Sequence, residues 1–186
     1  MTFIAIDGLD ASGKTTQALN ISKRLHDCGK TVCLRFHPSR DNLFGVKAKH
    51  FLYSQGRSAH FASALFYMLD VIRSILLYSW QKYDYIIFVR YLMGTAYLPS
   101  PLHRIAYHFF ASTVPKSDFM FFLDVSPEEA CRRIQRARKR QEMFENIKEL
   151  RQVRVKALSL AFTDKWKIIN ADKPEKEVEA EIRKFL

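Results

Sequence analysis

The sequence predicts one α/β domain in which helices cover both faces of a five-stranded parallel sheet. Five apolar runs along the chain are continuous rather than alternating with polar residues, which is typical of strands buried on both faces. Stretches with helical periodicity lie between these runs, and strands that alternate with helices form parallel sheets. The 186 residues suffice for one substantial core and show no repeat or linker, so we expect a single domain over 1–186.

The elements can be assigned in chain order. The apolar runs place strands at 2–6, 31–36, 85–89, 119–125 and 167–170. The segments that follow these runs place helices at 14–27, 59–81, 101–112, 127–160 and 174–186. Gly29 is a stop signal after the first helix, and Ser126-Pro127-Glu128-Glu129 is a start signal after the fourth strand. Each strand is therefore followed by a helix, as a sheet covered on both faces requires.

The composition limits the class of protein. Hydrophobic residues make up 48% and charged residues 26% of the chain, as in a folded globular protein. The apolar stretch at 61–80 is interrupted by Asp70 and Arg73, so we interpret it as a buried helix and expect no membrane span. The three cysteines lack metal or redox spacing and the first strand begins at residue 2, so we expect a cytoplasmic protein. The histidines, including His37, show no ligand spacing and are expected at or near the surface.

Positive charge is concentrated in one segment. The formal net charge is +11, and seven of these eleven charges lie between Arg132 and Lys156, where ten Lys and Arg face three Glu. Three interpretations are open: a nucleic-acid-binding face, a clamp for a polyphosphate, and an ordinary solvated helix face. The basic residues are not interleaved with aromatic residues, so we do not expect a nucleic-acid partner.

A glycine-rich turn joins the first strand to the first helix. Its residues 8–15, GLDASGKT, fit the pattern G-x-x-x-x-G-K-[ST], in which glycines let backbone N–H groups point at phosphate oxygens. Lys14 can reach the β- and γ-phosphates, the Thr15 hydroxyl can bind Mg²⁺, and the helix contributes its positive dipole end. The motif predicts a three-layer P-loop NTPase fold that binds a nucleoside triphosphate. The residues expected to hold ATP are Gly8, Asp10, Ala11, Ser12, Gly13, Lys14, Thr15 and Thr16.

The stretch FIAIDGLDASGKTTQ, at 3–17, resembles the opening of thymidylate kinases, and the resemblance continues in register along the chain. The further matching segments are 34–40, 64–70 (ALFYMLD), 90–97, 123–130, 153–154 and 169–178. The resemblance implies an enzyme that moves the γ-phosphoryl group of ATP to a nucleoside monophosphate, with dTMP as the expected acceptor. Thymidylate kinases dimerise through helices like the one expected at 59–81, so it also implies a homodimer.

The resemblance assigns residues to the acceptor as well. Arg90 and Arg40 would hold the acceptor phosphate, and Asp10 would bind the sugar hydroxyl or a magnesium-bound water. Tyr67 would stack on the acceptor base, and Tyr97 would lie below the sugar. Each assignment has a structural alternative: an ion pair for an arginine, a helix-terminal acid for Asp10, and a core position for a tyrosine.

A mobile lid is expected around 135–146, where the basic stretch corresponds to the lid of the family. Ala11 and Ser12 leave the P-loop without an arginine, so the resemblance implies that the lid supplies the cation on the transferred phosphate. The expected catalytic residues are Lys14, Arg90, Arg136, Arg138 and Arg140.

Two positions depart from the family pattern. Val89 stands where the family has an aspartate that supports Mg²⁺, so Asp7 or Asp124 would have to serve beside Thr15. Val71 stands where the family has an arginine for the thymine base, and the loss of such a donor weakens discrimination between bases. Two alternatives stay open: a kinase of the same fold for another phosphorylated acceptor, and an ATP-binding regulatory or nucleic-acid-binding protein that has lost phosphoryl transfer.

Overall fold

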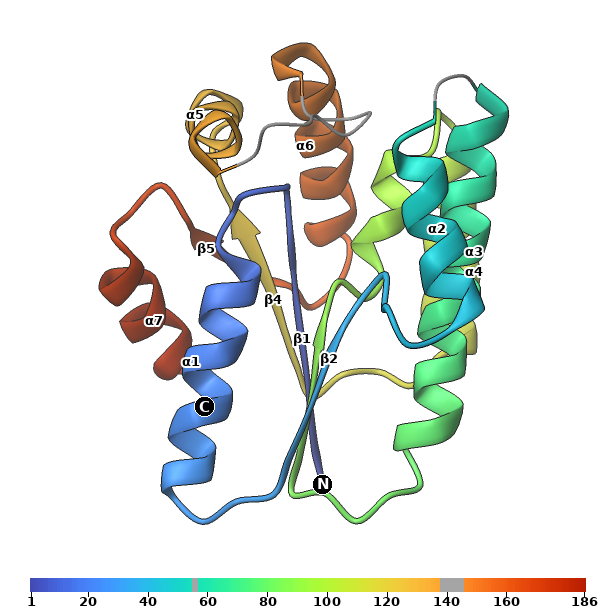
Figure 1. Ribbon diagram of the computed structural model, residues 1–186. Helices are drawn as coiled ribbons and strands as arrows, with labels where there is room; N and C mark the ends of the chain where they lie inside the picture. The colour runs from blue at the N-terminus through green and yellow to red at the C-terminus, as the bar shows by residue number, and fades with distance from the viewer. Residues whose placement is uncertain (55–56, 138–145) are drawn as a thin grey trace.

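A computed structural model describes residues 1–54, 57–137 and 146–186 of the chain. Its centre is an all-parallel sheet of five strands in the order β2-β3-β1-β4-β5 (Figure 1). The strands are β1 (Thr2–Gly8), β2 (Val32–Phe36), β3 (Tyr85–Val89), β4 (Phe119–Asp124) and β5 (Lys167–Asn170). The predicted α/β class is confirmed, and every strand lies within two residues of its expected bounds.

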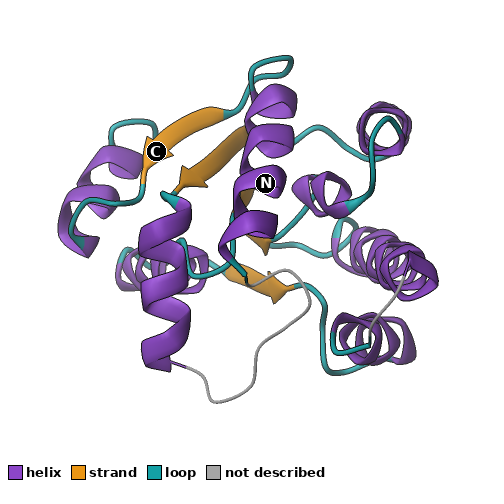
Figure 2. Cartoon of the chain, turned by 90° about the horizontal axis from the view of Figure 1, so that it is seen from above, coloured by secondary structure: helices purple, strands orange, loops and turns teal. Residues whose placement is uncertain are grey.

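Helices cover both faces of the sheet, as the side view and the view from above show (Figures 1 and 2). The helices are α1 (Lys14–Asp27), α2 (Leu43–Leu52), α3 (Arg57–Tyr78), α4 (Leu102–Thr113), α5 (Pro127–Ala137), α6 (Ile147–Ala161) and α7 (Glu175–Arg183), with a short 3₁₀ helix, η1 (Met93–Tyr97). α1 and α7 pack together on one face, and α3 and α4 lie on the other. α2 packs on α3, and α5 contacts α6. The three layers match the predicted P-loop NTPase arrangement.

The core lies between the sheet and these helices. Ile4, Ala5 and Ile6 of β1 are wholly buried because β1 is the central strand and is covered on both faces. The register pairs Ile6 with Val89 and Gly8 with Leu123, so the strands end together at one edge. The loops that leave this edge therefore meet above it, which is where ligands bind in open α/β sheets.

Two expectations about helices are wrong. The expected helix at 127–160 is two helices, because Asn146 caps the start of α6 by accepting a hydrogen bond from the Glu149 N–H at 2.9 Å. Helix α2 was not expected, and it begins in the same way: the Asn42 side chain accepts from the N–H groups of Phe44 and Gly45. Asparagine N-caps decide both outcomes, since they satisfy backbone donors that the first turn of a helix leaves free.

Helix α3 is long and apolar. Its segment Phe61–Tyr78 would be long enough and apolar enough to cross a membrane, but 39% of it is buried inside the fold. It packs against α2, and its Asp70 is wholly buried and hydrogen-bonded to the loop after β2. These contacts are those of a helix in a folded domain.

Candidate active site

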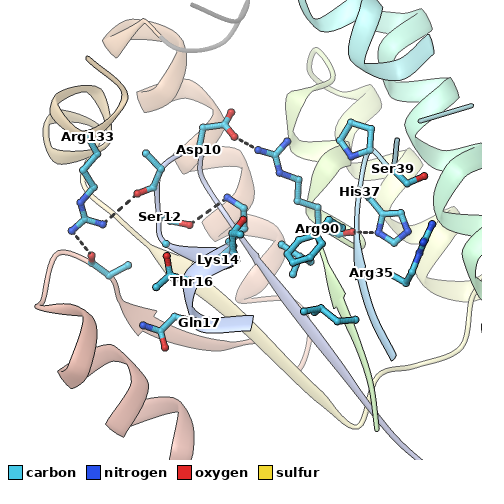
Figure 3. A pocket seen from close by; sticks show the side chains of 18 of the residues that line it. Asp10, Ser12, Lys14, Thr16, Gln17, Arg35, His37, Ser39, Arg90 and Arg133 are labelled. Carbon is cyan, nitrogen blue, oxygen red and sulfur yellow. Dashed lines mark hydrogen bonds and ion pairs between the residues drawn. The ribbon is translucent and has the colours of Figure 1, made fainter. Parts of the chain in front are cut away.

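A cavity of about 1040 Å³ runs along the carboxyl edge of the sheet. Its walls come from three stretches, at 10–17 between β1 and α1, 34–41 after β2, and 171–178 after β5, together with Arg90 and Arg133 (Figure 3). The glycine-rich turn lies in the middle of this cavity. One end therefore opens toward the β5–α7 loop and the other toward the β2–α2 loop.

The glycine-rich turn has the backbone shape expected of a phosphate-binding loop. Gly13, at φ +87°, is the N-cap of α1, and Ala11 also has a positive φ of 57°. Gly8 leaves β1 so close to β4 that a Cβ atom there would collide with the Leu123 carbonyl. Ser12 is buried within the turn. The N-terminus of α1 consequently points into the cavity, where its positive dipole end favours an anion.

The lysine of the turn is folded back on its own loop. The Lys14 ammonium donates hydrogen bonds to the carbonyls of Gly8, at 3.0 Å, and Leu9, and only 5% of the residue is exposed. Thr15 and Thr16 follow in the first turn of α1 with exposed side chains that line the cavity. A phosphate in the turn would thus meet a cation, two hydroxyls and the helix dipole together.

The far end of the cavity is organised by a residue that the sequence analysis did not single out. Arg133 of α5 donates to the carbonyl of Ala11 at 3.3 Å and to that of Ala171 at 3.0 Å, and Glu129 holds its Nε at 2.8 Å. Gln17 of α1 reaches the same region by donating to the Glu175 carbonyl at 3.0 Å. The sequence offers one signal for this role: Arg133 lies on one face of an amphipathic helix that begins shortly after β4.

Arg90 lies directly after β3 and points toward the glycine-rich turn (Figure 3). Its backbone is left-handed at φ +66°, and its guanidinium group forms an ion pair with Asp10. The hydroxyl of Tyr97 donates to the other oxygen of Asp10 at 3.2 Å. Burial, and then the Asp10 carboxylate, raise the pKa of Tyr97 well above its usual value, so its phenol stays protonated. The structure thus brings Asp10, Arg90 and Tyr97 together, as expected of an acceptor site.

A second, smaller cavity of about 40 Å³ lies beside this ion pair. Its lining includes Tyr67 of α3, whose hydroxyl donates to the Tyr91 carbonyl at 3.2 Å, and Gly94, which faces the ring so closely that a Cβ atom would collide with it. Tyr67 is only 7% exposed and forms part of the cavity wall. The cavity holds about one water in this state, so a pyrimidine ring would have to widen it.

Arg40 occupies the opposite wall of the main cavity, in the loop after β2. Its side chain is exposed and makes no hydrogen bond or ion pair with the residues that the structure describes. The loop itself is fixed, because the buried Asp70 carboxylate accepts from the Ser39 N–H at 2.6 Å, the Ser39 hydroxyl at 2.5 Å and the Asn42 amide at 2.7 Å. Arg40 is therefore an exposed cation on a rigid loop, and within the described ranges its guanidinium has no partner.

The expected magnesium ligands are placed differently from one another. Asp7 is 2% exposed, and one of its oxygens accepts from the N–H groups of Tyr91 at 2.8 Å and Met93 at 3.1 Å. Burial raises the pKa of Asp7, although these hydrogen bonds and the charge of Lys14 act to lower it. Both oxygens of Asp124 accept from Arg154 at 2.7 Å, whereas the Thr15 hydroxyl is exposed to the cavity.

Several arginines of the basic segment are neutralised by acidic residues that lie just before it in the chain. Arg132 and Arg133 pair with Glu129, Arg151 with Glu128, and Arg154 with Asp124. Arg136 is exposed near the end of α5. Arg138 and Arg140, and most of the expected lid, lie outside the described residues. The pairs that are described resemble a solvated helix surface more than a row of free cations for nucleic acid.

Comparison with known proteins identifies the family of the chain. The family model described as thymidylate kinase matches residues 6–182 of the chain. A probable thymidylate kinase of Pyrobaculum calidifontis is 32% identical, over 97% of this chain and 93% of the relative. One from Archaeoglobus fulgidus is 30% identical, over 98% and 93%. The solved structure of a thymidylate kinase from Candida albicans is 20% identical and shares the fold, with a TM-score of 0.75 over 98% of this chain and 89% of that one. The chain belongs to the thymidylate kinase family.

Proposed function

We propose that this protein transfers the γ-phosphoryl group of ATP to dTMP and releases dTDP and ADP. The observation that carries the proposal is a cavity in which the phosphate-binding turn before α1 lies next to Arg90 and Asp10, while Tyr97 reaches Asp10 from the smaller cavity beside it. Two anionic substrates can therefore be held side by side. Such an arrangement suits a reaction in which catalysis is mainly positioning and charge neutralisation.

The donor is assigned to the turn and the β5–α7 end of the cavity. The triphosphate takes the N–H groups of the turn, and the Lys14 ammonium leaves the Gly8 and Leu9 carbonyls for the β- and γ-phosphates. Arg133 and Ala171 line the wall where the rest of the donor nucleotide must lie. Their mutual hydrogen bond fixes the width of this end.

The acceptor is assigned to the other end. Its phosphate replaces Asp10 as the partner of the Arg90 guanidinium, with Arg40 contributing from the loop after β2. Asp10 and Tyr97 then remain for the sugar, and Tyr67 for the base. In this arrangement the acceptor oxygen and the γ-phosphorus face each other between Arg90 and the turn, as in-line transfer requires.

Magnesium fits this site with Thr15 as its protein ligand. Mg²⁺ keeps several waters and needs only one or two protein ligands besides substrate phosphates. The exposed Thr15 hydroxyl meets that need, whereas the hydrogen bonds of Asp7 and Asp124 leave those carboxylates as supports of the fold. When bound, Mg²⁺ neutralises charge on the β- and γ-phosphates.

Closure of a lid is part of the proposal. The turn has Ala11 and Ser12 where an arginine would have to stand, so the cation over the transferred group comes from Arg136, Arg138 or Arg140. Single glutamine substitutions at these three positions should separate them, because only the residue that touches the γ-phosphoryl group should lower kcat sharply with ATP binding preserved.

The protein is also proposed to be a cytoplasmic homodimer. Helices α3 and α4 and the turn after α3 expose a set of large apolar side chains: Phe61, Leu65, Leu76, Trp80, Ile105 and Phe109. Light scattering at micromolar concentration should give twice the 21.8 kDa chain mass. Leu76→Glu should halve the measured mass, whereas Val155→Glu, on exposed α6, should leave it unchanged; a monomeric wild type would contradict the dimer.

The activity is tested by coupled turnover with ATP across a panel of monophosphates: dTMP, dUMP, dCMP, AMP and GMP. We expect dTMP to give the highest kcat/KM. A different best substrate would favour the alternative of a kinase for another acceptor, which the valine at position 71 motivates. Tight ATP binding with no transfer to any acceptor would instead favour a protein that has lost catalysis.

A further inference from the structure

Arg90 has a strained backbone that its surroundings hold in place. At φ +66° a non-glycine residue is in a left-handed region that side chains disfavour. Its N–H donates to the Ile6 carbonyl at 2.9 Å, and its own carbonyl accepts from the Nδ1 atom of His37 at 3.0 Å (Figure 3). The direction of the guanidinium group therefore depends on partners of the Arg90 backbone.

His37 is well placed to fix that carbonyl. Because a carbonyl can only accept, Nδ1 must carry the proton, and Nε2 must accept from the hydroxyl of Ser74 at 2.9 Å. The residue is 4% exposed, and its ring packs edge-on against Phe88 with centroids 5.0 Å apart. The expectation of a surface or boundary position for His37 is thus wrong. The Arg90 carbonyl thus sets the tautomer of His37, and the Ser74 hydroxyl of α3 completes the arrangement by donating to Nε2.

The same helix fixes the second acceptor cation. Asp70 lies one turn before Ser74 on α3, so both side chains face the loop after β2. Asp70 accepts from the N–H and hydroxyl of Ser39 and from the amide of Asn42, the residues that flank Arg40 and Asp41. Adjacent turns of one helix thus hold the backbone beside Arg90 and the backbone beside Arg40.

We propose that α3 sets the spacing of the two acceptor-phosphate arginines, with His37 as the positioning residue for Arg90 and Asp70 as the positioning residue for Arg40. The proposal rests on the proposed function for what the arginines bind. Neither His37 nor Asp70 touches the substrate; each acts through the arginine whose backbone it fixes. Their effects should accordingly appear in acceptor kinetics and vanish when that arginine is absent.

The first test is a double-mutant cycle. His37→Phe keeps a ring and removes both nitrogens; it should lower kcat/KM for dTMP by about 10–100-fold and leave KM for ATP within about twofold. His37→Asn, whose amide can donate from near the Nδ1 position, should recover most of the loss. In an Arg90→Gln background, His37→Phe should add little, because the residue through which it acts is gone. Asp70→Asn should behave in the same way toward Arg40→Gln.

A matched control separates positioning from folding. His103→Phe changes another buried histidine, on α4 and outside both cavities, and should leave dTMP kinetics unchanged. Three results would each overturn the proposal. They are an equal rise in KM for ATP and for dTMP in His37→Phe, additive effects of His37→Phe and Arg90→Gln, and no recovery by His37→Asn.

A crystal structure of His37→Phe makes the test independent of the acceptor. The proposal expects Arg90 to leave φ near +66° and its guanidinium to leave Asp10. If Arg90 stays in place, the proposal is wrong whichever substrate the enzyme uses. If the wild type phosphorylates no monophosphate but Arg90 moves in the variant, the proposed function fails while the structural inference stands.

Discussion

The donor and acceptor ends of the site are built in different ways. The centre of the donor end is a continuous stretch of chain, 8–16, which presents backbone N–H groups and a helix terminus to a cavity of about 1040 Å³, with Arg133 and Ala171 on the adjoining wall. The acceptor end gathers side chains from separate elements, including Asp10, Tyr67, Arg90 and Tyr97, around about 40 Å³. A site of backbone groups is fixed by local sequence, whereas a site of side chains is only as accurate as the packing that brings its segments together.

Their resting cations differ as well. Lys14 rests on neutral carbonyls of its own loop, so a phosphate displaces weak hydrogen bonds. Arg90 rests on the buried carboxylate of Asp10, so an acceptor phosphate displaces an ion pair. Removing Arg90 should therefore also take away the ion-pair partner that the buried Asp10 carboxylate has in that arginine.

The largest effect is expected at the donor end. Lys14→Met should lower kcat by about 10³-fold, because it removes a preorganised cation from the phosphate on which charge develops. KM for dTMP should change little. Lys23→Met, an exposed lysine of the same helix, is the matched control and should behave as wild type in the same coupled assay. A loss of less than tenfold for Lys14→Met would remove the lysine from the reaction.

A loss of about 10²-fold is expected at the acceptor end. Arg90→Gln should lower kcat/KM for dTMP by that factor, with the dissociation constant of ATP unchanged by calorimetry. Arg104→Gln, an exposed arginine of α4, controls for loss of charge alone. Weaker ATP binding in Arg90→Gln would show that the two ends are not separate sites.

The same contrast explains what the sequence could reveal. The strands were predictable because buried parallel strands are continuous apolar runs, and the turn at 8–15 because its chemistry is local. The family was predictable from the order of weaker matches, and its model does match. The residues assigned to the acceptor lie in the cavity walls, and their roles stay predictions.

Local capping bonds and long-range contacts account for the features that could not be predicted. The split at Asn146 and the start of α2 at Asn42 depend on capping bonds that compete with helix continuation or loop. His37 looked like a boundary residue because Ser74 and Arg90, its partners, are 37 and 53 residues away. Arg133 was hidden among other arginines whose partners the sequence does not show.

A smaller effect should follow from the contact between Gly94 and Tyr67. Gly94→Ala pushes a methyl group into the ring of Tyr67. KM for dTMP should therefore rise about tenfold, while kcat for the transfer reaction should be nearly unchanged. Tyr67→Phe keeps the ring and loses only the hydroxyl bond to Tyr91, and should cost less. If Tyr67→Phe were the worse variant, the hydroxyl rather than the ring face would define the acceptor end.

The smallest effect is one of stability, and it should appear only at the acceptor end. Burial, with a smaller contribution from Arg35, lowers the pKa of His37 to about 4 from 6.5, while Asp70 and the Arg90 carbonyl oppose that shift. The unfolded chain therefore takes up the proton first as pH falls. The contribution of neutral His37 is complete above pH 6.5 and is lost progressively toward pH 4, by at most about 3 kcal/mol.

Urea unfolding at several pH values between 7.5 and 4.5 measures this loss. His37→Asn has no titrating group at position 37. As pH decreases, its free energy of unfolding should therefore fall less steeply than that of wild type, and the difference in stability between the two proteins should narrow. Lys14→Met should keep the wild-type slope, because the donor turn gains nothing from His37. Parallel slopes for wild type and His37→Asn would mean that folding does not lower the pKa of His37; Nδ1–H would still donate to the Arg90 carbonyl, but Nε2 would then donate to Ser74 at low pH.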